Sequence, residues 1–144
     1  HIDYRISCSC CSIWKPWLVA LMHMLVLDDS LTARGMIGNM LEDLGFTYSE
    51  ASNGEEALEL MDSSEKPDLV LVDWHMPKMN GIEFIIQMRS QPEYDSVVAL
   101  MVTTESEINR IDEALEAGAN EYLMKPFDLD ALTQKLKILG FVKG

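Results

Sequence analysis

A doubly wound α/β domain on a five-stranded parallel sheet is the fold class that the sequence predicts for most of its 144 residues. Short unbroken apolar runs alternate along the chain with longer segments whose apolar residues recur at helical spacing. Unbroken runs of this length are typical of strands that are buried on both faces. Strict alternation of strand and helix implies parallel strands joined by right-handed crossovers rather than by hairpins.

Five strands and five helices follow one another between residues 24 and 139. The predicted strands are 24–27, 47–51, 69–72, 97–102 and 122–124, and the second of these has the weakest pattern. Apolar residues at helical spacing predict helices around 36–44, 57–61, 82–86, 108–115 and 129–139. Five strands in a domain of this length fit the flavodoxin-like strand order 2-1-3-4-5.

Residues with turn and helix-capping preferences separate these elements. Ser30 and Asp128 are suited to cap the N-termini of the first and last helices. Gly45 and Gly118 follow helical patterns, where a residue of left-handed conformation often ends a helix. Four prolines lie between predicted elements: Pro67, Pro77, Pro92 and Pro126.

The first 21 residues differ in composition from the rest, and we expect them to be an N-terminal extension, native or not, to a domain at 22–144. They carry a net charge of +1 and all three cysteines, which leaves −14 on the other residues. The apolar run 17–27 is shorter than the roughly 20 residues of a spanning helix. Asp28 and Asp29 follow it where a secretory signal would have small residues for cleavage. The cysteine spacing does not match paired zinc ligands, and a domain without cysteines fits a reducing cytoplasm.

The chain is strongly acidic, with 24 Asp and Glu against 11 Lys and Arg and a net charge of −13. Such a surface repels the phosphates of nucleic acids. Anionic membranes attract clusters of Lys and Arg, which this chain lacks. We therefore expect neither direct nucleic-acid binding nor membrane binding, and we expect metal cations, basic patches and other proteins as partners.

Acidic residues follow the first and third predicted strands. Asp28 and Asp29 come directly after 24–27, and Asp73 comes directly after 69–72. In a sheet of order 2-1-3-4-5, ligands bind beyond the carboxyl ends of strands 1 and 3, where the strand order reverses. Three carboxylates in one crevice need a cation or raised pKa values to relieve their repulsion, and hard oxygen ligands favour Mg²⁺ over zinc or copper. We therefore predict a Mg²⁺ site at these three residues.

The fourth and fifth predicted strands end in residues that suit a phosphoryl group. Thr103 and Thr104 follow the fourth strand, and Lys125 follows the fifth. Hydroxyl and ammonium donors beside a cation can surround phosphoryl oxygens, and a carboxylate can be the nucleophile. Singly, an Asp after a strand is often a turn former and a Lys a solvated charge. Their joint occurrence at four strand ends favours the phosphoryl site.

Four segments of the chain resemble the receiver domain of two-component response regulators. They are 25–30 (LVLDDS), 69–81 (LVLVDWHMPKMNG), 100–105 (LMVTTE) and 118–127 (GANEYLMKPF). The resemblance extends over nearly all of residues 24 to 140 and is strongest to the single-domain chemotaxis members of the family. It implies a phosphoacceptor signalling switch with self-catalysed phosphorylation and dephosphorylation, not an enzyme that turns over a metabolite.

The resemblance also implies the acceptor and the metal ligands. Asp73 would accept a phosphoryl group from the phosphohistidine of a sensor histidine kinase. Asp28, Asp29, Asp73 and the backbone carbonyl of His75 would hold Mg²⁺, which Mn²⁺ could replace. His75 stands where related proteins often have Asn, and its side chain and Glu105 would flank the path of the hydrolytic water and tune dephosphorylation.

The switch residues are implied in the same way. Lys125 would pair with the phosphoryl group, and the Thr103 hydroxyl would move to bond it. Tyr122 would then change rotamer and alter the face formed by helix 4, strand 5 and helix 5. Thr104 stands where a smaller residue is common, which would bias the Tyr122 switch, and the peptide bond before Pro126 is expected to be cis.

Several functional alternatives stay open. The downstream partner is a flagellar-motor switch protein in chemotaxis, or a histidine phosphotransfer protein or another non-motor partner of a phosphorelay. A Mg²⁺-dependent phosphatase with an aspartyl nucleophile is a more remote alternative, because such enzymes have an acid two residues after the nucleophile, where this chain has His75. A flavin-binding module of the same fold is also remote, because Asp28 and Asp29 would repel the flavin phosphate.

Overall fold

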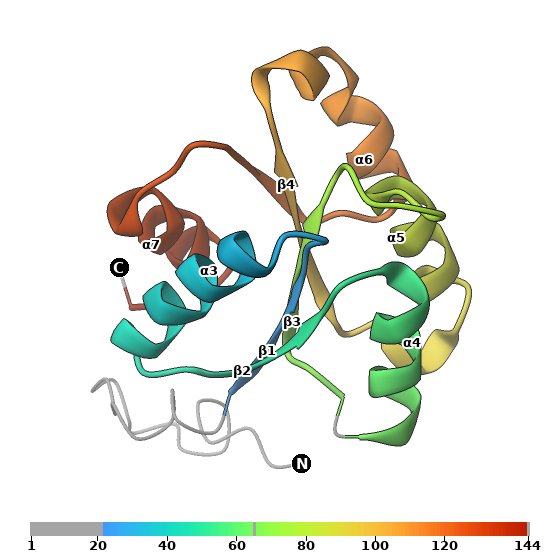
Figure 1. The fold of residues 1–144 in the computed structure, drawn as a ribbon, viewed down its shortest axis with the longest axis horizontal. Coiled ribbons are helices and arrows are strands. Elements are labelled where there is room, and N and C mark those ends of the chain that lie inside the picture. The colour runs from blue at the N-terminus through green and yellow to red at the C-terminus, as the bar shows by residue number, and fades with distance from the viewer. Residues whose placement is uncertain (1–21, 65, 144) are drawn as a thin grey trace, which may run out of the picture.

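The computed structural model describes residues 22–64 and 66–143, in which five strands form one parallel sheet of order β2-β1-β3-β4-β5 (Figure 1). Each pair of neighbouring strands is parallel. The predicted fold class and strand order are therefore confirmed. The strands are β1 (His23–Leu27), β2 (Thr47–Ala51), β3 (Leu69–Asp73), β4 (Val98–Thr103) and β5 (Glu121–Met124).

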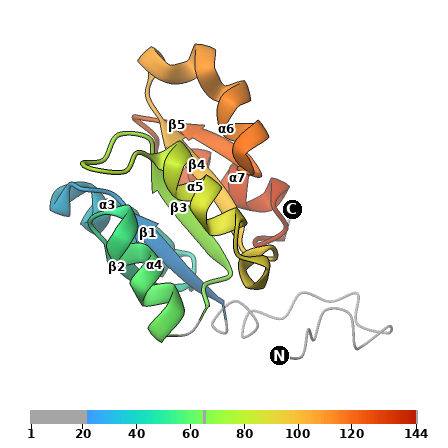
Figure 2. The same cartoon turned by 90° about the vertical axis from the view of Figure 1, so that its right-hand side faces the viewer.

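Helices cover both faces of this sheet (Figures 1 and 2). One face packs against α4 (Gly54–Ser63), α5 (Gly81–Arg89) and α6 (Ile111–Ala117), and the other against α3 (Leu31–Asp43) and α7 (Leu129–Ile138). Two short 3₁₀ helices, η1 (Pro92–Tyr94) and η2 (Glu105–Arg110), precede β4 and α6. The described residues thus form the three layers of a doubly wound domain.

The two layers of helices explain why the central strands β1 and β3 have apolar residues at successive positions. In β1, Leu25 and Leu27 belong to the apolar cluster under α4 and α5, whereas Met24 and Val26 belong to the cluster under α3 and α7. Successive side chains of a strand point to opposite faces, so a strand buried on both faces requires apolar residues at every position.

The expected caps and turns occur at the helix ends. The side chains of Ser30 and Asp128 accept hydrogen bonds from the backbone N–H groups three residues on, at the starts of α3 and α7. Gly45 and Gly118 have φ angles of 95° and 124°, a conformation that is strained for residues with a Cβ. These residues end helices and direct the chain back into the sheet.

One helix differs from its prediction, because segment 105–110 is the 3₁₀ helix η2 and α6 begins only at Ile111. The hydroxyl of Thr104 bonds the carboxylate of Glu107 instead of capping a helix. The hydroxyl of Ser106 bonds the same carboxylate. Such local side-chain bonds compete with regular helical geometry, which accounts for the tighter turn.

The predicted extension, residues 1–21, lies outside the described residues. Among the described residues, no helix has both the length and the apolar composition needed to span a bilayer.

Candidate functional site

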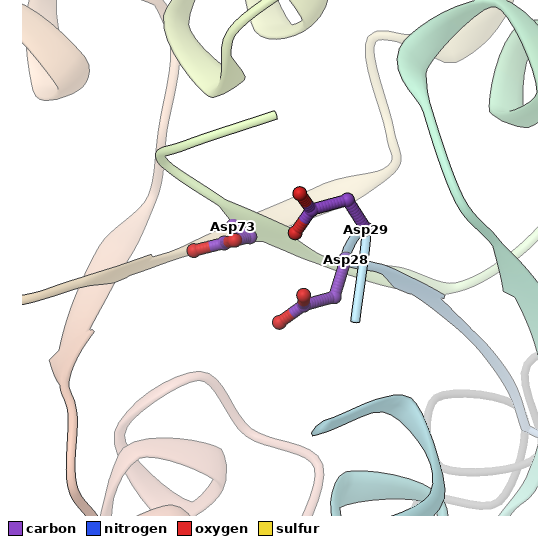
Figure 3. Close-up of side chains that lie close together, drawn as sticks. All are labelled: Asp28, Asp29 and Asp73. Atoms are coloured by element: carbon purple, nitrogen blue, oxygen red, sulfur yellow. The ribbon is translucent and has the colours of Figure 1, made fainter. Parts of the chain in front are cut away.

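Three carboxylates meet at the carboxyl ends of β1 and β3. Asp28, Asp29 and Asp73 each offer a carboxylate oxygen, and these oxygens lie within 4.8 Å of one another (Figure 3). The register pairs Leu27 of β1 with Val72 of β3, so the residues that follow lie side by side at the same edge of the sheet. Asp28 and Asp73 are buried, whereas Asp29 is exposed to solvent. The structure therefore brings together the three acids that the sequence analysis selected.

The electrostatics of this cluster favour a cation. The pKa of Asp73 is raised to about 6, mainly by burial and in addition by the negative charge of Asp28, while Lys125 partly opposes both effects. Two buried carboxylates and an exposed one, all offering oxygen ligands at close range, fit a hard cation such as Mg²⁺. The carbonyl of His75, two residues after Asp73, stays a predicted ligand.

The anchoring of Asp28 is asymmetric. One oxygen of its carboxylate accepts a hydrogen bond from the backbone N–H of Ser30 at 2.9 Å, and the other accepts one from the Nζ of Lys125 at 3.0 Å. Its own backbone N–H donates to the carbonyl of Ala51, the last residue of β2. The Asp28 side chain is therefore held in place before any ligand binds.

The ammonium of Lys125 lies between two buried acids. Its Nζ is 3.0 Å from Asp28 and 3.5 Å from Asp73, so the contact with Asp28 is the shorter one. Burial by itself would lower the pKa of Lys125, but the two carboxylates raise it above its ordinary value, so the side chain stays charged. The peptide bond between Lys125 and Pro126 is cis.

The hydroxyl of Thr103 lies fully buried at the end of β4 and donates to the carbonyl of Thr104 at 3.2 Å. In the described structure it is thus engaged within its own loop. The hydroxyl of Thr104 turns the other way and bonds Ser106 and the carboxylate of Glu107. The two neighbouring threonines therefore have different surroundings.

Glu107 is a buried acid that the sequence analysis did not select. Its Oε1 lies 2.8 Å from the Nε2 of His75. Burial would raise its pKa, but hydrogen bonds from Ser106, Thr104 and His75 lower it to about 2. Glu105, which the sequence analysis placed beside His75, is exposed at the start of η2. The Ser/Thr-x-x-Glu spacing from Thr104 to Glu107, typical of the start of a helix, is the sequence signal that could have distinguished Glu107 from Glu105.

Two aromatic residues flank the site. Trp74 follows Asp73, is buried, and has the guanidinium of Arg110 at 5.4 Å from its ring centroid. Tyr122 in β5 is half-buried, with the ammonium of Lys135 at 4.3 Å from its ring centroid. Cations at these distances are attracted to aromatic rings.

Comparisons with known proteins agree with this geometry. A model of the response regulator receiver domain family matches residues 24–137. A Chemotaxis protein CheY homolog of Campylobacter jejuni is 40% identical over 125 residues, which are 85% of this chain and 96% of that protein. The Chemotaxis protein CheY of Pseudomonas aeruginosa is 40% identical over 125 residues, which are 85% of this chain and 100% of that protein.

Solved structures show the same relationship. The chemotaxis response regulator CheY4 of Vibrio cholerae superposes with a TM-score of 0.76 at 33% identity, over 82% of this chain and 98% of that one. A putative response regulator from Chloroflexus aurantiacus superposes with a TM-score of 0.77 at 30% identity, over 82% and 96% of the two chains. The chain belongs to the response regulator receiver domain family of two-component systems and is similar to CheY.

Proposed function

We propose that this chain is a phosphorylatable signalling switch that accepts a phosphoryl group from a sensor histidine kinase onto Asp73. The observation that carries the proposal is the position of the Asp73 carboxylate, which lies between two further carboxylates and the ammonium of Lys125. A buried nucleophile that lies beside both cation ligands and an ammonium suits phosphoryl transfer.

Each residue of the site would have its own role in phosphoryl transfer. Asp28, Asp29, Asp73 and the carbonyl of His75 would hold Mg²⁺, or Mn²⁺ in its place, and the bound cation offsets negative charge on phosphoryl oxygens. An oxygen of Asp73 attacks phosphorus as the bond to the kinase histidine nitrogen breaks, and that nitrogen regains a proton. The Lys125 ammonium, now beside Asp28, would shift to a phosphoryl oxygen.

The conformational switch would follow from a new hydrogen bond. The Thr103 hydroxyl donates to the Thr104 carbonyl in this structure, and a phosphoryl oxygen on Asp73 would give it a stronger, charged acceptor. Movement of this loop would change the rotamer of Tyr122 and the face formed by α6, β5 and α7. The preference of the phosphoryl group for one arrangement would shift the population toward it.

The downstream partner is inferred from the relatives and from exposed apolar residues. Relatives named chemotaxis proteins support a flagellar-motor switch protein as the target. Leu115 of α6 and Met124 of β5 are both 41% exposed on the face that would change, and they suit a protein contact. A histidine phosphotransfer protein or another non-motor partner is the second candidate. Either partner would be met in the cytoplasm.

The acceptor is tested by incubation with acetyl phosphate and Mg²⁺, followed by a phosphate-affinity gel. The wild-type chain should give a retarded band that Asp73→Asn and excess EDTA both abolish. Asp95→Asn, which changes an exposed acid after η1, is the matched control and should keep the band. A retarded band in Asp73→Asn would refute the assignment of the acceptor.

The partner is tested by capture on immobilised protein with and without beryllofluoride, which mimics the phosphoryl group. A motor-switch protein should be retained better by the beryllofluoride form, and Thr103→Ala should lose this difference while still being phosphorylated. Transfer of the label to a histidine phosphotransfer protein, without motor-protein capture, would instead support the second candidate.

The domain boundary is part of the proposal, with 22–144 as the receiver domain and 1–21 as an extension. A chain that starts at Met22 should keep its unfolding midpoint and its phosphorylation rate. Loss of either would show that the domain includes residues before Met22.

A further inference from the structure

We infer that Arg34, held by Glu50, is a positioning residue for the proposed Mg²⁺ site. The inference rests on the proposed function and adds two residues that touch neither the cation nor the phosphoryl group. Arg34 lies in the first turn of α3, and Glu50 lies in β2. Neither residue belongs to the acidic cluster itself.

Arg34 makes two hydrogen bonds that join three elements. Its Nη1 donates to the backbone carbonyl of Asp28 at 2.7 Å, and its Nε donates to the Oε1 of Glu50 at 2.9 Å. The arginine side chain is only 13% exposed and its bond to the Asp28 carbonyl is partly buried, whereas the Glu50 side chain is 37% exposed. The end of β1 is thereby tied to the start of α3 and to the neighbouring strand.

The carbonyl that Arg34 binds belongs to the peptide group linking Asp28 to Asp29. The orientation of this peptide sets the directions in which the two side chains leave the backbone. Asp28 has additional bonds to Ser30 and Lys125, but no side-chain bond to Asp29 is present in the described residues. The exposed Asp29 therefore depends most on the backbone for its position, and Arg34 holds that backbone.

Glu50 supports the arginine rather than the cation site. Its carboxylate binds the Nε of Arg34, which leaves the Nη1 directed at the carbonyl. The planar guanidinium can bond both groups at once in a fixed geometry, which a lysine ammonium does not reproduce. Groups that orient metal ligands typically change metal affinity 10- to 100-fold when they are removed.

The test measures Mg²⁺ affinity directly, by titration of the intrinsic tryptophan fluorescence, to which Trp74 next to Asp73 contributes, and by the Mg²⁺-dependent rise of the urea unfolding midpoint. Arg34→Ala should weaken Mg²⁺ binding roughly tenfold, and Glu50→Gln should weaken it less. Arg34→Lys, which keeps the charge and loses the planar fork, should resemble Arg34→Ala. The rate of phosphorylation by acetyl phosphate should fall at low Mg²⁺ and recover at saturating Mg²⁺.

Arg89→Ala is the matched control. The guanidinium of Arg89 also donates to backbone carbonyls, those of Tyr94 and Gly118, but at the opposite end of the sheet. This variant should lose stability without losing Mg²⁺ affinity, which separates a positioning role from a merely structural one.

Equal Mg²⁺ affinity of the wild-type chain and Arg34→Ala would overturn the inference and leave the proposed function standing. Wild-type affinity in Arg34→Lys, with weak binding in Arg34→Ala, would overturn the positioning role in favour of a charge effect. A wild-type chain that binds no Mg²⁺ would overturn both proposals.

Discussion

The imidazole Nε2 of His75 lies 2.8 Å from the carboxylate Oε1 of Glu107 and joins the loop after β3 to the 3₁₀ helix after β4. The imidazole is mostly exposed, with 69% of its side-chain surface accessible, whereas only 6% of the Glu107 side chain is accessible. The buried Glu107 carboxylate is also bonded by the hydroxyls of Thr104 and Ser106. It anchors an exposed imidazole two residues after Asp73, the proposed phosphoacceptor.

Removal of the Glu107 carboxylate should destabilise the domain. Glu107→Ala leaves the hydroxyls of Thr104 and Ser106 without their acceptor, and we expect a loss of about 1 to 2 kcal/mol in the free energy of unfolding. Urea denaturation measures the loss, and amide hydrogen exchange should accelerate in η2. Glu113→Ala, which removes an exposed partner of Arg110, should change the stability little. Equal stability of the two variants would contradict this role of Glu107.

The charge of Asp73 should cost stability in the absence of Mg²⁺. Because the pKa of Asp73 is raised from 3.8 to about 6, the folded state binds a proton more tightly than the unfolded state between these values. The contribution of this group to the free energy of unfolding therefore falls as the pH rises from about 4 to 6, and it is constant above.

Asp73→Asn, which carries no charge, should lack this pH dependence. In EDTA it should exceed the wild-type stability by about 1 to 2 kcal/mol above pH 6, and by little near pH 4. Urea denaturation at a series of pH values measures the difference. If the stability advantage of Asp73→Asn instead grows toward low pH, the pKa of Asp73 is not raised in the folded state.

Lys125 should stabilise the metal-free site. Lys125→Met leaves the buried Asp28 and Asp73 without their common cation, and we expect a loss of about 1 to 3 kcal/mol in EDTA at low salt. Added Mg²⁺ should raise the unfolding midpoint of this variant more than that of the wild type. Lys143→Met, at an exposed position, is the control. Undiminished stability of Lys125→Met would mean that the ammonium does not offset the carboxylates.

Two glycines should respond in opposite ways to a methyl group. A Cβ on Gly81 would lie 2.6 Å from the backbone carbonyl oxygen of Asp73 and 3.1 Å from the Cα of Trp74. Gly81→Ala must therefore displace the backbone at Asp73 and Trp74. We expect the free energy of unfolding of this variant to fall by more than about 2 kcal/mol and its phosphorylation to be slower. Gly35→Ala in α3 meets no atom within 4 Å and should gain about 0.5 to 1 kcal/mol. Thermal unfolding measures the stabilities of both variants. A Gly81→Ala variant with wild-type stability and phosphorylation rate would contradict this prediction.

The sequence by itself determined the fold class and the location of the acids. Alternating apolar runs and helical spacings suffice because the central strands of a parallel sheet covered on both faces need apolar residues at successive positions. Asp28 and Asp73 follow two such runs, and the carboxyl ends of parallel strands meet at one edge of the sheet. Their proximity therefore needed no knowledge of side-chain packing.

The tertiary structure alone decided which side chains contact one another. The Thr104-to-Glu107 spacing could mark Glu107, but only the fold places its carboxylate 2.8 Å from the imidazole of His75 after β3 and leaves Glu105 in solvent. The bond from Arg34 to Glu50 depends likewise on how α3 packs against β2. The contacts of His75 with Glu107 and of Arg34 with Glu50 are set by distances of a few ångströms between separate elements, and local sequence patterns do not specify such distances.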